Sequence, residues 1–138
     1  MSDTLTISSQ DALIRDGFPE IVLAAGIFVP RYDNAGLRLR TTDLPERIIV
    51  TVTDEAVYCF SSTYRGVHLV PDRLLVRMDR ETTAVQIHHG LRFRVIELTD
   101  SNTGSEIALE GRRMAAHTGC VISALRARVL RTQPLASV

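Results

Sequence analysis

The chain has 138 residues, of which 45% are hydrophobic and 23% are charged. This composition is typical of a folded domain and excludes a disordered tail. Sixteen basic residues balance sixteen acidic ones, so the whole molecule has no electrostatic field that would draw it onto nucleic acid or an anionic bilayer. Arginines outnumber acids only in the second half of the chain, so any such attraction must be local.

The length and the absence of a linker predict a single domain over residues 1–138. The first residues lack the basic and apolar regions of a signal peptide, and the longest apolar run is far shorter than a membrane helix, so we expect a cytoplasmic protein. Every basic residue is arginine, which favours a bacterial genome of high GC content. Cys59 and Cys120 have no CxxC spacing and are expected to be two buried thiols.

The N-terminal region is polar before it becomes strongly apolar. Residues 1–10 are expected to fray, and residues 9–15 have the pattern of a short helix, so residues 1–20 are interpreted as an arm or a short helix. The apolar run at 21–29 predicts a core strand that Pro30 stops.

Short β-like segments continue to residue 109, separated by polar or glycine-containing turns. After the first strand they cover residues 37–40, 47–53, 57–60, 67–70, 74–77, 83–88, 91–98 and 105–109. Residues 61–66 are expected to form a loop. The clearest segment is 47–53, where Ile48, Val50 and Val52 alternate with Ile49, Thr51 and Thr53 on opposite faces.

The segment at 91–98 carries Arg92 and Arg94 on one face and continues that face with Ile96 and Leu98. Such a strand is either covered on both faces or interrupted by a bulge.

The hydrophobic period becomes helical from Arg112 onward. A closing amphipathic helix is expected over residues 112–130, and Pro134 should prevent much extension. Its predicted apolar stripe contains Met114, Thr118, Val121, Ile122, Leu125 and Val129. The fold class is therefore mainly β: a barrel or sandwich of about seven antiparallel strands over residues 21–109, with one C-terminal amphipathic helix.

Residues 49–60, with the sequence IVTVTDEAVYCF, resemble the strand, Thr-Asp turn and apolar-aromatic strand of bacterial pleckstrin-homology-like (PH-like) domains and their GRAM relatives. The resemblance covers roughly residues 45–131. It implies a seven-stranded barrel, so that either 37–40 or 67–70 would be loop. The arginine common near the position of Ala56 is missing, as is the tryptophan that eukaryotic PH domains carry in the closing helix.

Arginine pairs are the candidate binding residues. Arg38 and Arg40 project from one strand face near Arg31 and could hold a phosphate or carboxylate, a role that the PH-like resemblance also implies for a basic stretch at the barrel opening. The alternative is a solvated face paired with nearby acids. Arg92 and Arg94 form a secondary basic pair. Arginines near the end of the closing helix, at 126, 128 and 131, complement its dipole without any ligand.

The sequence contains no catalytic or cofactor motif that we recognise. His88 and His89 are adjacent on a strand and should point to opposite faces, so no metal is predicted. There is no GxSxG, GxGxxG or P-loop pattern, and no cofactor is expected. The few aromatic residues are not interleaved with the arginines, which argues against nucleic acid.

These observations predict a non-enzymatic PH-like binding module that recognises a protein, peptide or anionic group through loops and an exposed sheet edge. Self-association into a homo-oligomer through the same edge is compatible with this interpretation. The alternative is a small β-barrel that encloses a small molecule, either as a carrier or as an enzyme. A third interpretation is an assembly subunit whose partner covers the arginine-rich half.

Overall fold

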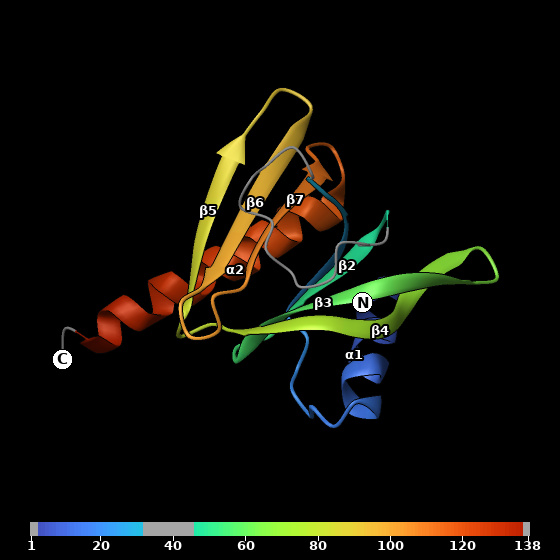
Figure 1. Cartoon of the computed structure of the whole chain (residues 1–138), viewed down its shortest axis with the longest axis horizontal. Helices are drawn as coiled ribbons and strands as arrows, with labels where there is room; N and C mark the ends of the chain where they lie inside the picture. Colours follow the sequence, from blue (N-terminus) through green and yellow to red (C-terminus); the bar gives the residue numbers. More distant parts are fainter. Residues whose placement is uncertain (1–2, 32–45, 137–138) are drawn as a thin grey trace.

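The computed structural model describes residues 3–31 and 46–136, with residues 128–136 described by their backbone only. Seven antiparallel strands and two flanking helices make up the fold (Figure 1). In chain order they are α1 (Thr4–Arg15), β1 (Ala24–Pro30), β2 (Ile48–Val52), β3 (Ala56–Arg65), β4 (His68–Asp79), β5 (Thr83–His89), β6 (Phe93–Asp100), β7 (Glu106–Arg112) and α2 (Ala116–Ala136). The expected mainly β class with a C-terminal helix is confirmed.

The strands form one sheet in the order β4-β3-β2-β1-β7-β6-β5. Strand β1 joins its two halves, because Ala24–Phe28 pair with β2 while Val29 and Pro30 pair with β7. The two halves diverge from this junction, and β4 and β5 are left as the sheet's two edges (Figure 1).

The two helices cover opposite faces of the sheet. Buried side chains from α2 join apolar residues of both half-sheets in the larger core, which contains Phe28, Val50, Leu98, Leu109, Val121 and Leu125 among others. A second core lies between α1 and the other face of the β1–β4 half, and includes Leu5, Leu13, Ile49, Tyr58 and Phe60. That half of the sheet is therefore buried on both sides.

Strand β2 has the alternation that the sequence predicts. Ile48, Val50 and Val52 point into the α2 core, whereas Ile49 points into the α1 core. Because helices cover both faces, every residue of β2 is buried.

From Asp3 onward, the prediction that residues 1–10 fray is wrong. Helix α1 begins at Thr4, and the side chain of Asp3 caps it by accepting a hydrogen bond of 2.7 Å from the backbone N–H of Thr6. Gly17 follows the helix with a φ of +88°, in the left-handed region where glycine is favoured. The cap and the apolar contacts with the sheet stabilise a helix that starts well before residue 9.

The expected loop at 61–66 is mostly strand. Residues 61–65 continue β3, and the segments at 67–70 and 74–77 belong to one strand, β4, despite Pro71 between them. Register shifts in the β3–β4 pairing absorb the irregularity, and an edge strand tolerates a proline because its outer N–H has no ladder partner. This merger removes one strand candidate. The segment at 37–40 lies outside the described residues.

The closing helix differs from its predicted bounds. Residues 111 and 112 still pair with β6, so α2 begins at Ala116, and Met114 lies in the exposed connection instead of the apolar stripe. Thr118, Val121, Ile122 and Leu125 are buried as predicted. The helix passes its predicted end at residue 130 and reaches Ala136, two residues beyond Pro134, so the missing N–H and the ring of the proline affect only its end.

Strand β6 was predicted either to be covered on both faces or to contain a bulge. The pairings of β6 with β5 and β7 run without a register shift, so this strand has no bulge. Ile96 and Leu98 are buried in the larger core, whereas on the other face Val95 is buried but Phe93 and Thr99 are exposed, so that face is covered only in part.

Helix α2 is held close to the sheet by a small residue and an arginine. Gly111 leaves no room for a Cβ, which would lie 2.6 Å from Phe28 Cε2 and 2.7 Å from Thr118 Oγ1. From the β4–β5 connection, Arg80 donates hydrogen bonds to the carbonyls of Thr53, Ala124 and Leu125, at 2.8 to 3.0 Å. These contacts fix the helix across the divergence of the two half-sheets. Within the described residues, neither helix has the length and hydropathy needed to cross a bilayer.

Candidate functional site

Strand β5 forms an open edge of the sheet. It pairs with β6 on one side, and no described strand pairs with its other side (Figure 1). Residues 83–89 contain no proline, lysine or acidic residue, the features that usually prevent an edge from pairing with another chain. This edge can therefore accept an additional strand.

Two hydrogen bonds establish which backbone groups of β5 face outward. Ser101 N–H donates to Thr82 O at 3.0 Å, and Gly90 N–H donates to Phe93 O at 2.9 Å. In an antiparallel pair, residues alternate between bonding the partner strand and pointing away from it. Even-numbered positions of β5 thus bond β6, and the outward groups belong to Thr83, Val85, Ile87 and His89.

The same residues direct their side chains toward the α2 side of the sheet. Val85 and Ile87 pack, partly exposed, against the larger core, where Ala124 of α2 also packs. At the end of the strand, His89 Nε2 lies 3.1 Å from Arg126 Nη2. A strand added to β5 would find outward hydrogen-bonding groups and an apolar surface on the same residues. We call Thr83, Val85, Ile87 and His89 the β5 edge.

The opposite edge is obstructed. Pro71 interrupts the donors of β4, and its pairing with β3 is irregular around Phe60. The Arg15 side chain from α1 donates a 2.6 Å hydrogen bond to the backbone carbonyl of Asp72. These features are known ways of preventing edge pairing, and they distinguish β4 from β5.

The structure places only part of the predicted arginine site. Arg31 bonds Ala108 O through its backbone N–H, and its side chain lies 3.6 Å from Glu110 Oε1. Arg31 thus has an acidic neighbour on β7, which is remote in sequence. Arg38 and Arg40 lie outside the described residues.

Arg92 and Arg94, the secondary arginine pair, lie close to two further arginines that are distant in sequence. Phe93 is in register with Arg112, and Arg113 N–H donates to Arg92 O at 2.9 Å. Four arginines, at 92, 94, 112 and 113, therefore gather where the β5–β6 hairpin meets the β7–α2 connection. The adjacent arginines at 112 and 113 are visible in the sequence, but their proximity to Arg92 and Arg94 follows only from the pairing of β6 with β7.

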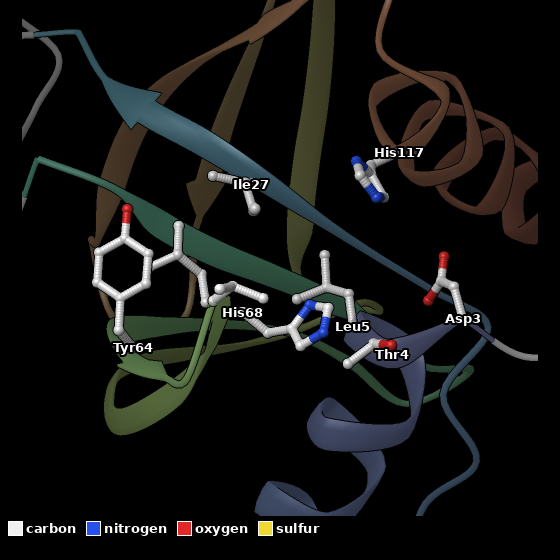
Figure 2. A pocket seen from close by; sticks show the side chains of 9 residues that line it. Asp3, Thr4, Leu5, Ile27, Tyr64, His68 and His117 are labelled. Carbon is white, nitrogen blue, oxygen red and sulfur yellow. The ribbon is translucent and has the colours of Figure 1, made fainter.

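A surface hollow of about 400 Å³ lies between the start of α1, β1, the β3–β4 hairpin and the start of α2. Figure 2 shows His68 from β4 and His117 from α2, with Leu5 of α1 between them in this view. The nearby Asp3 has a lowered pKa, chiefly because of its hydrogen bond from the Thr6 N–H, with a smaller contribution from His117. Its carboxylate is therefore committed to capping the helix.

The two cysteines are not equivalent, which corrects the expectation of two buried thiols. Cys59 is fully buried in β3, and burial raises its pKa to about 12. Cys120 is exposed because it lies outside the buried stripe of α2. It borders a shallow surface hollow lined mostly by small residues of that helix.

The histidines of β5 point to different surroundings. His88 Nε2 pairs with Glu97 Oε1 at 3.1 Å, whereas His89 contacts Arg126. In the described part of the chain, no group of three or more histidine, cysteine and acidic side chains could hold a metal ion. No protein-family model matches this chain, and no curated protein matches it significantly.

Proposed function

We propose that this chain is a non-enzymatic PH-like interaction module that binds an extended peptide segment along the β5 edge. The observation that carries the proposal is the outer side of β5, which pairs with no described strand and whose backbone groups and apolar side chains belong to the same residues. Main-chain hydrogen bonds to such an edge provide affinity, and pockets for alternate side chains provide specificity.

The PH-like part of the proposal rests on the resemblance of residues 49–60 and on the order of elements. Seven antiparallel strands followed by a helix that packs against both half-sheets are what the resemblance implies. Fold alone does not specify function, so the peptide assignment depends on the edge and not on the family.

The packing of the interior also favours an interaction module over the enclosed-pocket alternative. Large side chains, among them Phe28, Met78, Ile96 and Leu109, fill the space between the half-sheets and α2. The three hollows that are lined by residues in the described part of the chain all open to the surface. A carrier would need an apolar cavity that removes most of its ligand from water.

The test begins with selection from a displayed library of random linear peptides, followed by NMR titration of the isotope-labelled protein with an enriched peptide. We expect the largest amide shifts at positions 83, 85, 87 and 89, and smaller shifts at 84, 86 and 88. Enriched peptides whose shifts map elsewhere, or a failure to enrich any peptide, would overturn the proposal.

A proline substitution gives the second arm of the test. Val85→Pro removes an outward N–H without removing a bond to β6, and should abolish peptide binding while the protein stays folded. Val85→Ala shortens the side chain but keeps the N–H, so it should retain binding. Equal binding by both variants would rule out strand addition. The β5 edge could also be occupied by a second copy of this chain. Analytical sedimentation of the free protein tests this, because a wild-type dimer that becomes a monomer in Val85→Pro would identify the second copy as the occupant.

A further inference from the structure

A second surface, which adjoins the β5 edge and shares His89 with it, combines positive charge with exposed apolar side chains. It consists of residues 88–94 and 111–114, which we call the arginine tip. The backbone contact between Arg113 and Arg92 joins these two segments, as does a long hydrogen bond of 3.5 Å from Arg113 Nη1 to Leu91 O. The tip is thus one end of the sheet, built from the hairpin and the β7–α2 connection, where Phe93 and Arg112 project from the face opposite to Arg94.

The charges of the arginine tip have one sign. Its residues include four arginines and two histidines and no aspartate or glutamate. Of the acids that follow on the strands, Glu97 pairs with His88 of the tip, and Glu110 pairs with Arg31, which lies outside it. Among the described residues, the structure gives Arg92, Arg94 and Arg112 no carboxylate partner. The tip therefore carries a concentrated positive charge on a molecule whose total charge is zero.

Apolar side chains project from the same place. Leu91 is 90% exposed, Met114 is 92% exposed and Phe93 is 42% exposed. Single exposed apolar residues are ordinary, but Leu91 and Met114 lie in the two connections that the Arg113 contacts join, and grouped exposed apolar residues mark interaction sites. Leu91 and Met114 lie in connections instead of regular elements, so they can enter another medium without disturbing the sheet.

We propose that the arginine tip binds the surface of an anionic bilayer. Leu91 and Met114 enter the boundary between headgroups and acyl chains, while the arginines hold lipid phosphates through charge-assisted hydrogen bonds. This pairing of insertion with attraction favours a membrane over nucleic acid, for which the tip offers a single aromatic ring for stacking. The inference does not depend on peptide binding at β5.

The test is co-sedimentation of the full chain with vesicles of phosphatidylcholine alone or of equimolar phosphatidylcholine and phosphatidylserine. We expect binding to the anionic vesicles that weakens with added salt, and little binding to the neutral ones. Each arginine near an anionic surface strengthens binding by about fivefold, so Arg92→Gln with Arg113→Gln should weaken it by roughly 25-fold. Leu91→Ser with Met114→Ser should weaken it by at least about tenfold.

Matched controls come from the opposite hairpin and its edge strand. Arg65→Gln with Arg73→Gln makes the same change in net charge at exposed positions of β3 and β4, and Val67→Ser removes an exposed apolar residue from a turn. These variants should bind the vesicles nearly as wild type does, and circular dichroism checks that all variants are folded. Equal losses in tip and control variants, or no binding to anionic vesicles, would overturn the proposal. Binding to duplex DNA or polyglutamate without binding to vesicles would replace the membrane with another anion.

Discussion

The Tyr58 hydroxyl donates a 2.6 Å hydrogen bond to Glu20 Oε2 and so ties the segment between α1 and β1 to the middle of β3. Arg77 Nε donates to the same hydroxyl at 3.1 Å, and Thr53 Oγ1 donates to the other carboxylate oxygen at 2.7 Å. Phe18 completes the cluster, with its ring 5.2 Å from that of Tyr58. This polar cluster fixes the chain that leads from α1 into the sheet.

Tyr58→Phe should lower the free energy of unfolding by about 2 kcal/mol, because it removes a partly buried hydrogen bond to a charged group. Urea denaturation measures the loss. Tyr64→Phe is the matched control, because the Tyr64 side chain is exposed and its hydroxyl accepts one long hydrogen bond of 3.4 Å from Arg47 Nη1. This substitution should change the free energy of unfolding by less than about 0.5 kcal/mol. Similar losses in both variants would mean that the Tyr58 bond to Glu20 contributes little.

Alkaline pH should weaken the same cluster. The pKa of Tyr58 is raised to about 12, first by burial and then by its hydrogen bond to Glu20, whereas an unfolded tyrosine titrates at about 10. The folded state thus holds the proton more tightly, so this stabilisation is complete below about pH 10 and is lost as the pH rises through about 12. The Cys59 thiol titrates in an overlapping range, so the measurement uses a Cys59→Ala background.

In that background, we expect the difference in unfolding free energy between Tyr58 and its phenylalanine variant to shrink as the pH rises from about 9 to about 12. Urea denaturation at a series of pH values provides the curves. Parallel curves for the two proteins would contradict a raised pKa at Tyr58.

Two glycines should respond to alanine in opposite directions. Gly111→Ala places a Cβ against Phe28 and Thr118, which should cost about 2 kcal/mol of stability. At Gly119 in α2, a Cβ would meet no described atom within 4 Å beyond the backbone of its own helix, so Gly119→Ala should stabilise by roughly 0.5–1 kcal/mol through helix propensity. Thermal denaturation distinguishes the signs. A neutral Gly111→Ala would show that α2 can move away from β7 at little cost.

The two thiols should differ in their reaction with a disulfide reagent at neutral pH. Cys120 is exposed and should react at once, whereas Cys59 is buried with a raised pKa and should react only when the protein opens. Cys120→Ser should remove the rapid phase and leave the slow one. Two rapid phases in the wild type would contradict the burial of Cys59.

Local pattern predicts much of this fold. The two faces of β2 and the buried stripe of α2 from Thr118 to Leu125 follow from periodicity. Two segments were predicted wrongly, the start of α1 and the break near Pro71, because tertiary packing decides their structure and local sequence pattern does not. Asp3 is a recognisable helix cap, but the helix it begins is stabilised by packing on a sheet formed much later in the sequence. Pro71 reads as a strand break, and only its edge position makes it tolerable.

The candidate sites were less accessible to sequence analysis, because they depend on which strands are neighbours. Nothing in the pattern of residues 83–89 says that β5 lies at an edge, since the pairing of β1 with β7 decides the order of the whole sheet. The sequence identifies Arg92 and Arg94 as a pair because they are two residues apart. Their proximity to Arg112 and Arg113 follows only from the register between β6 and β7. Long-range pairing is the information that periodicity lacks.

The position of β1 between two half-sheets also affects how the chain reaches its native state. β1 can pair with β2 early during synthesis, but its other partner, β7, and the α2 side chains that close the larger core emerge only after the remaining strands. Contacts of such wide sequence separation slow folding, because loop-closure entropy is lost before they form. The chain must therefore leave part of its apolar surface uncovered until Leu125 is free to pack on it, and a chaperone that shields this surface should improve its folding yield.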